Sequence, residues 1–394
     1  MSPYLFTLGT VLSAVILFAG HMAFWIGLYN RWHGTGLPRH AVRGLSLATL
    51  VMMLLSGAAP AAWLALRAPS FPAITDRFEG ALFLVWAVAC CLLFLVVTTR
   101  WALRRWFIRP QARLLSNATS SLNIRAQVGD RAVGDKTIRI AACIPGNQIL
   151  DVSTQTKLLS IAELPASLEG LRIAHLSDLH MAGQLTPTFF DAAVDQVNEL
   201  NADLVTITGD IVDKWSCIKW IPKTLGRLTS RFGNFFVLGN HDRRVPDVGY
   251  LRSTLTGCGL EDLGGNCVLR SIRGQKVLLA GNERPWFQQI PSISQRDNEQ
   301  RQFSIALSHS PDQLPWAREH RFDLLLAGHT HGGQIRFPLI GPIVCPSRSG
   351  VWYASGLFDA PPTLMHVSRG LSGLFPVRLN CRPEISLLEL RRQA

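Results

Sequence analysis

Three long stretches of this 394-residue chain contain no Asp, Glu, Lys or Arg: residues 1–30, 44–66 and 80–99. A helix needs roughly 20 apolar residues to cross the hydrocarbon core of a bilayer, so each stretch is long enough to span it. Buried helices of a soluble bundle normally keep a polar stripe, which these stretches lack. A cleaved signal peptide would need a basic start and a shorter apolar centre than residues 1–30 provide. The sequence therefore predicts three membrane-spanning helices.

The arginines between these stretches predict the orientation of the spans. Basic residues collect on the cytoplasmic side of a membrane. The second loop holds Arg67 and Arg77, which are offset by Asp76 and Glu79. The first loop and the segment after residue 99 are richer in arginine. The first loop holds Arg31, Arg39 and Arg43, and the later segment holds Arg100, Arg104, Arg105, Arg109 and Arg113. We therefore expect the segment after the third span to be cytoplasmic, with a mirrored topology as the alternative.

The charge and the cysteines exclude two classes of protein. The net charge is +12, but eight basic residues lie in the juxtamembrane stretches, where anionic headgroups are their natural partners. No nucleic-acid-binding signature is present, so nucleic acid is not expected as an obligate partner. The eight cysteines form no C-x-x-C pair, which predicts neither a disulfide framework nor a zinc ribbon. Free thiols suit a reducing compartment.

The chain after the spans alternates between short apolar runs and helical patterns. We predict a membrane region over residues 1–113, a connector with edge strands over 114–165, and a further folded domain over 166–394. Alternating strands and helices indicate an α/β layered fold in which helices cover the sheet. Six buried strands are predicted, over residues 171–176, 204–208, 235–238, 277–280, 303–307 and 324–327. Ligands of such sheets bind at the carboxyl ends of the strands.

Polar clusters follow five of these predicted strands directly. They are Ser177-Asp178-Leu179-His180, Gly209-Asp210-Ile211-Val212-Asp213, Gly239-Asn240-His241-Asp242, His309, and Gly328-His329-Thr330-His331. Taken singly, Asn or Asp beside Gly is ordinary turn chemistry, and a lone histidine is usually a core residue. Together they would place many carboxylates and imidazoles in one cleft, where charge without compensation is costly. Two metal ions would balance that charge.

Phosphate ester hydrolysis is the chemistry that most needs such a site. Its uncatalysed rate is so slow that accelerations up to ~10²¹-fold are required. Two metal ions roughly 3.5–4 Å apart bind phosphoryl oxygens and lower the pKa of an attacking water. Mixed imidazole and carboxylate donors suit Mn²⁺, Fe or Zn²⁺ better than Ca²⁺. We expect two divalent ions, with Mn²⁺ preferred and Fe or Zn²⁺ as alternatives.

The ordered set D-x-H, G-D-x-x-D, G-N-H-D, a later His and G-H-T-H resembles the signature of the calcineurin-like metallophosphoesterases, from about Leu171 onward. The spans and the run from Gly328 to Gln334 are most similar to the membrane-anchored bacterial branch. The resemblance implies a layered β-sandwich flanked by helices, preceded here by the three spans. It also implies a location in the bacterial inner membrane with the catalytic domain on the cytoplasmic side.

The resemblance implies a role for each matching residue. Asp178, His180 and His331 would hold one metal ion, Asn240, His309 and His329 a second, and Asp210 would bridge both. His241 would protonate the leaving oxygen or stabilise the transition state, and Asp213 would orient it. Ser/Thr protein phosphatases carry Arg-Gly and Glu where this chain has Lys214-Trp215 and Asp242, so a phosphoprotein substrate is disfavoured. Arg243, Arg244, Arg336, Arg348 and Arg369 are candidate substitutes for the missing phosphate contact, outside the predicted site.

Three functional hypotheses follow. The first is a membrane-anchored phosphoesterase that hydrolyses a phosphodiester or pyrophosphate, such as UDP-2,3-diacylglucosamine or another lipid-linked substrate. The second is a broad phosphodiesterase or phosphatase of soluble small molecules, tethered by its spans. The third is a metal-stabilised membrane scaffold without catalysis, which ranks last because every expected ligand and His241 are present. The oligomeric state does not follow from the sequence.

Overall fold

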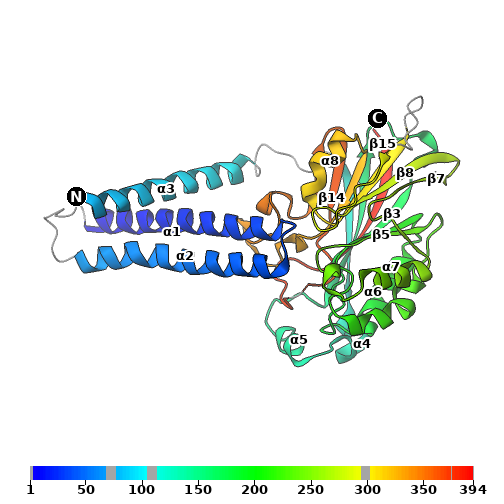
Figure 1. Ribbon diagram of the computed structural model, residues 1–394, viewed down its shortest axis with the longest axis horizontal. Helices are drawn as coiled ribbons and strands as arrows, with labels where there is room; N and C mark the ends of the chain where they lie inside the picture. The colour runs from blue at the N-terminus through cyan, green and yellow to red at the C-terminus, as the bar shows by residue number, and fades with distance from the viewer. Residues whose placement is uncertain (1–2, 68–76, 104–112, 294–301, 374, 394) are drawn as a thin grey trace. The chain divides into compact units, whose positions relative to one another are not determined.

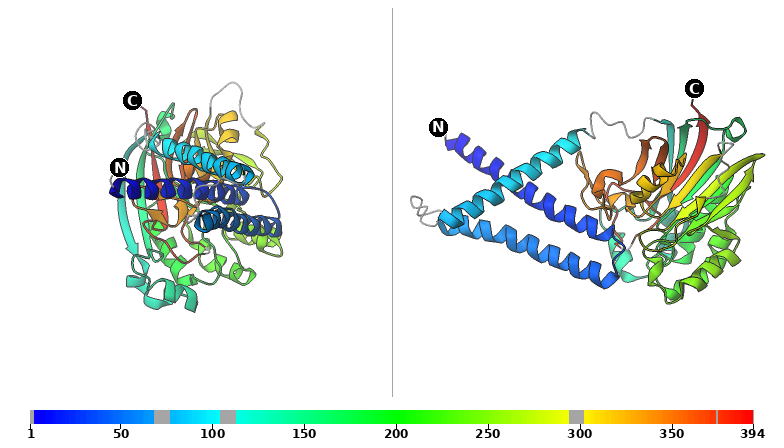
Figure 2. Two further views of the ribbon diagram at one scale, coloured as in Figure 1. Left: turned by 90° about the vertical axis from the view of Figure 1, so that its left-hand side faces the viewer. Right: turned by 45° about the horizontal axis from the view of Figure 1, so that its top comes forward.

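The computed structural model describes residues 3–67, 77–103, 113–293, 302–373 and 375–393 (Figures 1 and 2). The chain separates into a helical unit and an α/β unit. The helical unit holds α1 (Pro3–His33), α2 (Arg39–Arg67) and α3 (Arg77–Ala102). All three are long and apolar enough to cross a membrane, which confirms the prediction of three apolar helices and indicates membrane association.

Close packing and a few polar contacts join the membrane helices to one another. A Cβ on Gly20 would lie 1.9 Å from the carbonyl oxygen of Cys90, so only glycine permits this approach of α1 to α3. The His21 Nε2 atom is 2.9 Å from the carbonyl oxygen of Met53 on α2. Trp32 Nε1 donates a hydrogen bond of 3.1 Å to Thr49 Oγ1. Small residues and satisfied polar groups are what helix packing in lipid requires.

The α/β unit contains two large sheets and a short hairpin. The seven-stranded sheet runs in the order β1 (Leu114–Asn123), β2 (Asp151–Ile161), β15 (Glu384–Arg392), β3 (Arg172–Leu176), β4 (Leu204–Thr208), β5 (Asn234–Val237) and β6 (Leu260–Asp262). The six-stranded sheet runs in the order β13 (Gly356–Ala360), β14 (Thr363–Val367), β10 (Leu324–Ala327), β9 (Phe303–Ser308), β8 (Gln275–Asn282) and β7 (Cys267–Ile272). The hairpin pairs β11 (Arg336–Phe337) with β12 (Gly341–Pro342).

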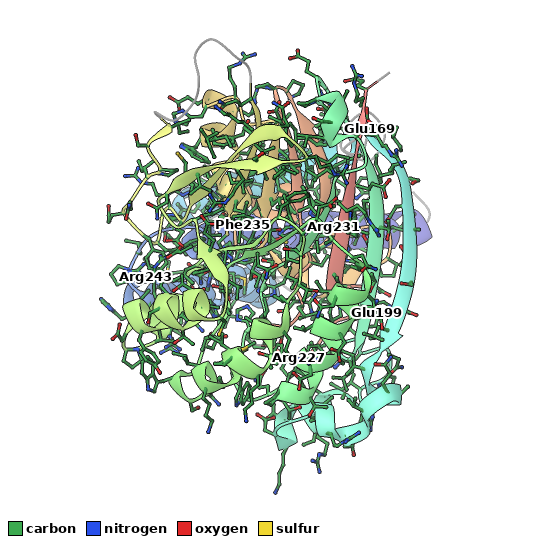
Figure 3. The ribbon with its side chains drawn as sticks, turned by 90° about the vertical axis from the view of Figure 1, so that its right-hand side faces the viewer. Glu169, Glu199, Arg227, Arg231, Phe235 and Arg243 are labelled. Atoms are coloured by element: carbon green, nitrogen blue, oxygen red, sulfur yellow. The ribbon has the colours of Figure 1, made fainter. Side chains whose placement is uncertain are left out.

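Helices cover the outer faces of these sheets, and apolar side chains fill the space between them. Successive side chains of a strand point to opposite faces. On β3, Ile173 packs into the core between the sheets, whereas Ala174 packs against the helical layer. Phe235 on β5 is buried in the inter-sheet core (Figure 3). The covering helices are α4 (Ile124–Val128), α5 (Lys136–Ala141), α6 (Pro187–Glu199), α7 (Val248–Gly257) and α8 (Leu314–Glu319). The predicted sandwich flanked by helices is confirmed.

All six predicted strands are present as β3, β4, β5, β8, β9 and β10. The segment 114–165 supplies β1 at the sheet edge and β2 next to it, paired on its other side with β15. Strand β15 lies near the end of the chain and has no predicted counterpart. It inserts between β2 and β3, parallel to β2 and antiparallel to β3. Its position depends on partners more than 200 residues away in sequence, so no local pattern reveals it.

A charged layer lies inside the sandwich. Lys157 on β2 forms a short ion pair with Glu384 on β15, and both side chains are almost fully buried. Lys157 Nζ is also 2.8 Å from His366 Nε2, and His366 Nδ1 is 2.9 Å from His175 Nδ1. The other carboxylate oxygen of Glu384 accepts a 2.7 Å hydrogen bond from Arg369 Nε. Burial raises the pKa of the Glu384 carboxyl, whereas the positive charges of Lys157 and Arg369 lower it. The cations have the larger effect and hold this pKa well below its usual range.

Replacing Lys157 with Met should destabilise the α/β unit strongly, because a buried carboxylate would lose its short ion pair. Breaking a buried pair from one side costs about 3–5 kcal/mol. For a unit of this size that corresponds to a fall in Tm on the order of 10 °C. Thermal unfolding of the detergent-solubilised full chain measures the change. Lys276→Met, at an exposed position on β8, is the control and should shift Tm by no more than ~2 °C. Equal shifts for both variants would contradict the assigned role of the charged layer.

Candidate metal centre

The nine residues predicted from the sequence all lie in loops that follow β3, β4, β5, β9 and β10. Backbone hydrogen bonds join two of these loops, since the Asp178 N–H donates to Gly209 O and the His180 N–H donates to Asp210 O. Strands β3, β4 and β5 are parallel neighbours in one sheet, and β9 and β10 are parallel neighbours in the other. Their carboxyl ends therefore deliver the polar side chains to one edge of the sandwich.

The first cluster consists of Asp178, His180, Asp210 and His331, whose candidate ligand atoms lie within 4.8 Å of one another. His180 Nε2 is 3.2 Å from His331 Nε2 and 3.6 Å from Asp210 Oδ2. His331 Nε2 is 3.4 Å from Asp178 Oδ1. Four donor atoms thus face a common point, as ligands of one ion do.

The second cluster shares Asp210 with the first. Asp210, His309 and His329 again have candidate ligand atoms within 4.8 Å of one another. His309 Nε2 lies 3.2 Å from Asp210 Oδ2, 3.2 Å from Asn240 Oδ1 and 3.2 Å from His329 Nδ1. One carboxylate therefore stands between two groups of nitrogen and oxygen donors.

The hydrogen bonds of the imidazoles show that the clusters fit cations. His180 Nδ1 donates to Asp213, His331 Nδ1 donates to Ser372 O, and His309 Nδ1 donates to Thr208 O. The Nε2 atom of a neutral histidine bonded in this way carries a lone pair. Two such lone pairs, on His180 and His331, face each other at 3.2 Å. Lone pairs at that distance repel unless a proton or a metal ion lies between them. Because the Asp178 and Asp210 carboxylates share the cluster with these imidazoles, the donor set fits a metal ion.

Burial and the Asp210 carboxylate set the pKa values of the clustered groups. Burial opposes charge on His309, but the Asp210 carboxylate outweighs it and raises the pKa of His309 to about 9. Burial also opposes charge on Asp210, yet His309 and His241 hold the pKa of this carboxyl well below its usual range. Burial, followed by the neighbouring imidazole His309, lowers the pKa of His329 well below its usual value. Asp210 thus carries a full negative charge that attracts cations.

Asp213 connects the first cluster to His241. One oxygen of Asp213 accepts a 2.7 Å hydrogen bond from His180 Nδ1, and the other accepts a 2.5 Å hydrogen bond from His241 Nδ1. Arg244 donates from Nη1 to Asp213 Oδ1 at 2.9 Å and from Nη2 to His241 Nε2 at 2.8 Å. His241 therefore keeps its proton on Nδ1 and presents a lone pair at Nε2. Burial lowers the pKa of His241, which favours this neutral form.

The backbone around the clusters is strained. Asp178, His180, Asp210, His329 and His331 all have φ between 47° and 70°. Side chains other than glycine pay about 1–3 kcal/mol each for this conformation, which clusters at functional sites. At Gly209, φ is 83° and a Cβ would lie 2.6 Å from His309 Nδ1, so a side chain is excluded there. The local G-D pattern is thus required for the turn that presents Asp210.

Asp242 is a structural residue at this edge. Its carboxylate accepts hydrogen bonds from the backbone N–H groups of Ile211, Val212 and Gly239, at 2.8–2.9 Å. Burial and the nearby Asp210 carboxylate raise the pKa of Asp242 to about 7. Asp242 therefore holds the loops that carry Asp210 and His241 together.

Of the five arginines considered from the sequence, Arg244 alone is hydrogen-bonded to His241 within the described part of the chain. Arg243 beside it is exposed (Figure 3), Arg369 pairs with Glu384, and Arg336 donates to Ser355 Oγ. The sequence signal for Arg244 is its place directly after the G-N-H-D block. Trp286 was not predicted from the sequence. The centroid of its ring lies 4.8 Å from that of His329 and 5.3 Å from that of His309.

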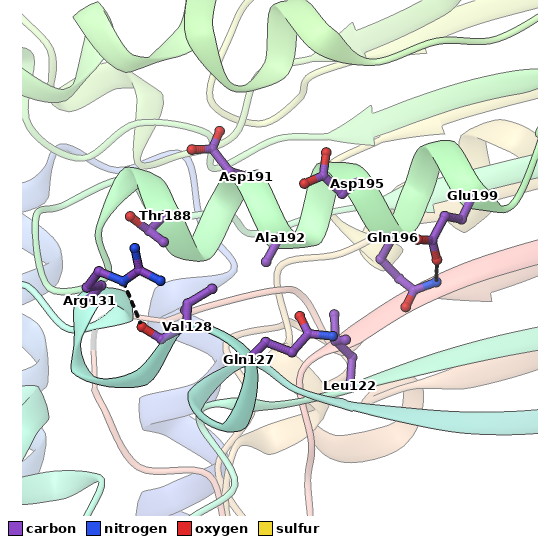
Figure 4. Close-up of a pocket in the computed structure, with 10 residues that line it drawn as sticks. All are labelled: Leu122, Gln127, Val128, Arg131, Thr188, Asp191, Ala192, Asp195, Gln196 and Glu199. Atoms are coloured by element: carbon purple, nitrogen blue, oxygen red, sulfur yellow. Dashed lines mark hydrogen bonds between the residues drawn. The ribbon is translucent and has the colours of Figure 1, made fainter.

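A groove beside α6 is separate from these clusters. It is about 480 Å³ in volume and lies between α6 and the segment from Leu122 to Arg131 (Figure 4). Its lining includes the acidic side chains Asp191, Asp195 and Glu199, and none of the nine predicted residues. The predicted site residues therefore lie at the strand ends, outside this groove.

Comparisons with known proteins agree with the geometry. Residues 171–333 match the family model "Calcineurin-like phosphoesterase". The chain is 31% identical over 224 residues to phosphodiesterase YaeI of Escherichia coli, covering 56% of this chain and 82% of that protein. It is 29% identical over 252 residues to the metallophosphoesterase YkuE of Bacillus subtilis, covering 61% and 86% of the two chains. It is 24% identical over 277 residues to the UDP-2,3-diacylglucosamine pyrophosphatase LpxG of Chlamydia muridarum, covering 57% and 84%.

The matched residues contain every block of the predicted signature, from Asp178 to His331. Members of this family bind two divalent metal ions, and the two clusters that share Asp210 fit that requirement. The chain therefore belongs to the calcineurin-like phosphoesterases and is a metal-dependent phosphoesterase.

Proposed function

We propose that the α/β unit hydrolyses a phosphodiester or pyrophosphate bond with two Mn²⁺ ions. Asp178, His180 and His331 would hold one ion, Asn240, His309 and His329 the second, and Asp210 both. The observation that carries this assignment is the single Asp210 carboxylate between two clusters of donors. Bound ions supply Lewis-acid chemistry, which polarises phosphoryl oxygens and activates water. Residues 114–165 and 166–394 together form the catalytic domain in this proposal, because β1 and β2 complete its sheet.

The proposed role of His241 follows from its hydrogen bonds. Asp213 holds the Nδ1 side of the ring, so that Nε2 is the atom presented to a substrate. In the structure Nε2 accepts from Arg244, which can move to a phosphate oxygen when substrate enters. His241 Nε2 then takes up a proton from solvent and donates it to the leaving oxygen, which departs as a hydroxyl group. Asp213 keeps the ring oriented through both steps.

The proposed substrate is lipid-linked, such as UDP-2,3-diacylglucosamine. Three apolar helices hold the enzyme at a bilayer, and a relative is named as the pyrophosphatase of this lipid. Water would add across the P–O–P bond to release UMP and the diacylglucosamine phosphate. A soluble phosphodiester is the second candidate, since another relative is named as a phosphodiesterase.

The test uses the full chain in nanodiscs, stripped of metal and reloaded with Mn²⁺, Fe²⁺ or Zn²⁺. We expect UMP release from UDP-2,3-diacylglucosamine with Mn²⁺, well above the rate of the metal-free protein. A chromogenic phosphodiester is assayed in parallel. Turnover of the phosphodiester but not of the lipid would replace the lipid-linked substrate with a soluble one. Absence of turnover on both substrates by the Mn²⁺-loaded protein would refute the proposed function.

We also propose that the catalytic domain faces the cytoplasm of a bacterial cell. The basic first loop and the basic segment after α3 support this orientation. All eight cysteines are free, as expected in a reducing compartment. Labelling of exposed Cys143 by a membrane-impermeant maleimide tests it, because intact cells should protect this thiol and permeabilised cells should not. Equal labelling of both preparations would place the domain outside.

Replacing Arg244 with Ala should raise KM by about 10–100-fold and change kcat less. The reason is that a hydrogen bond to a charged group contributes roughly 1.5–3 kcal/mol, and 1.4 kcal/mol is a factor of ten. Steady-state kinetics on the chromogenic phosphodiester measure the change. Arg243→Ala is the matched control, because this neighbouring arginine is exposed, and its KM should stay within about twofold. Equal effects of both variants would mean that Arg244 contributes only general positive charge.

A further inference from the structure

An exposed apolar hairpin follows the last residue of the metal centre. Strands β11 and β12 pair through Arg336 with Pro342 and Phe337 with Gly341, and Pro338 to Ile340 form the turn. Leu339 and Ile340 at this turn are 87% and 61% exposed. Phe375 is 74% exposed and lies beside the hairpin, since its carbonyl oxygen accepts from Gln334 Nε2 at 2.9 Å. The term apolar hairpin is used below for residues 335–344 together with Phe375.

Exposed apolar side chains of the α/β unit concentrate in this one place. Twelve large hydrophobic side chains are exposed among the residues described after position 112. Half of them belong to the apolar hairpin: Ile335, Phe337, Leu339, Ile340, Val344 and Phe375. Leu339 also has a φ of 67°, a conformation that is unfavourable for a branched side chain. A concentration of exposed apolar side chains of this kind marks an interaction surface rather than ordinary surface composition.

The base of the hairpin is fastened to the metal centre. The Arg336 N–H donates to Leu379 O, and the Leu379 N–H donates to Gln334 O, both at 3.0 Å. The same C-terminal segment contributes Ser372 O, which accepts from Nδ1 of His331. His331 is four residues before Ile335 in the chain. A molecule bound on the hairpin is therefore held at the edge where the metal centre lies.

The charge around the hairpin selects the kind of partner. Residues 331–383 contain five arginines and a single acidic residue, Asp359, which pairs with Arg113 at 3.0 Å. Arg369 and Arg382 pair with Glu384 and Asp151, and Arg378 is buried. This leaves Arg336, half-buried at the hairpin, and the exposed Arg348 to face anionic groups. The Asp312 carboxylate lies at the segment that carries Arg348, where it accepts from the Arg348 N–H at 2.9 Å, so Arg336 is the cation within the hairpin itself. Exposed apolar side chains beside an arginine suit a surface that enters anionic lipid headgroups.

We propose that the apolar hairpin inserts into an anionic bilayer surface and so holds the metal centre against lipid headgroups. The membrane helices of the same chain keep the α/β unit within reach of that surface. The inference extends the proposed function, because it explains how a lipid-linked phosphate would be presented to the site. A second copy of the chain or another protein on this patch is the competing outcome.

A photocrosslinking experiment tests the contact without relying on activity. Benzoylphenylalanine replaces Ile340 in the full chain, which is reconstituted in nanodiscs of phosphatidylcholine with or without phosphatidylglycerol. Ile290, an exposed position outside the hairpin, receives the same label as the control. We expect lipid adducts by mass spectrometry from position 340, increased by phosphatidylglycerol, and not from position 290. Protein–protein adducts alone at 340, or lipid adducts of equal yield at both positions, would overturn the proposal.

A kinetic comparison separates this inference from the proposed function. The measured quantity is the rate on UDP-2,3-diacylglucosamine in nanodiscs divided by the rate on a soluble phosphodiester. The variant Leu339→Ser/Ile340→Ser should lower this ratio about tenfold or more, because two side chains lose their burial in lipid. Ile290→Ser should leave the ratio within twofold of the wild type. An unchanged ratio for the double variant would refute the hairpin contact. If the wild type does not cleave the lipid at all, the proposed substrate fails, and the crosslinking result still decides the hairpin.

Discussion

Asp210→Asn should abolish turnover and remove bound metal. The Asp210 carboxylate lies between the two donor clusters, with Oδ2 at 3.2 Å from His309 Nε2 and 3.6 Å from His180 Nε2. Its depressed pKa keeps it ionised at neutral pH, so the substitution removes a full negative charge from both clusters. Loss of a residue that only supports a ligand costs about 10–100-fold in metal affinity or activity. Loss of a shared ligand should exceed that range.

Metal content by mass spectrometry and the rate on a chromogenic phosphodiester are measured on the same sample. Asp195→Asn, at an exposed carboxylate of α6, is the control and should retain both. The backbone turn is preserved in the Asn variant, because asparagine tolerates the positive φ of this position. An Asp210→Asn protein that keeps its full metal content and rate would contradict the shared-ligand assignment.

His241→Ala should lower kcat by about 10²–10⁴-fold, the usual contribution of general acid–base catalysis, while metal content stays unchanged. The ring contributes to no cluster that includes Asp210, and its Nε2 atom is 4.0 Å from Asp210 Oδ2. Asp213 remains in place to hold His180 after the substitution, because its second oxygen makes that hydrogen bond. The first metal ion should therefore remain bound.

The choice of substrate makes this experiment specific to proton donation. A nitrophenolate leaves without needing a proton, whereas an alkoxide needs one. His241→Ala should therefore impair an alkyl phosphodiester much more than a nitrophenyl phosphodiester. His180, Asp213 and His241 also bring candidate ligand atoms within 4.8 Å of one another. Equal losses on both substrates, together with a loss of metal, would mean that His241 is a ligand rather than a proton donor.

The sequence was most informative where a property is local. The absence of charged residues from 1–30, 44–66 and 80–99 identifies the apolar helices, because charged side chains are costly in the hydrocarbon core of a bilayer. Short, mainly apolar runs with a glycine near one end identify β3, β4 and β10, since each of these strands is buried on both faces. The candidate metal ligands could also be recognised locally, because each sequence block that contains them directly follows a strand.

The pairing of strands belongs to the tertiary structure. Glu384 opens β15, and its partner Lys157 lies 227 residues earlier on β2. In the sequence these two residues look like ordinary surface charges, and only the insertion of β15 between β2 and β3 buries them together. The burial of a charge depends on which strands become neighbours, and neighbours distant in sequence leave no trace in a local pattern.

The same contrast applies within the metal centre and beside it. The blocks from Asp178 to His331 specify donors by their residue types, and parallel strands bring them to one edge. Two adjacent arginines, Arg243 and Arg244, are equivalent in sequence, yet the 3₁₀ helix Asp242–Arg244 directs Arg244 to the imidazole and leaves Arg243 in solvent. The sequence alone therefore determined which chemistry the chain can perform. The tertiary structure decided which side chains share a hydrogen-bond network, because those distances depend on packing between segments far apart in the chain.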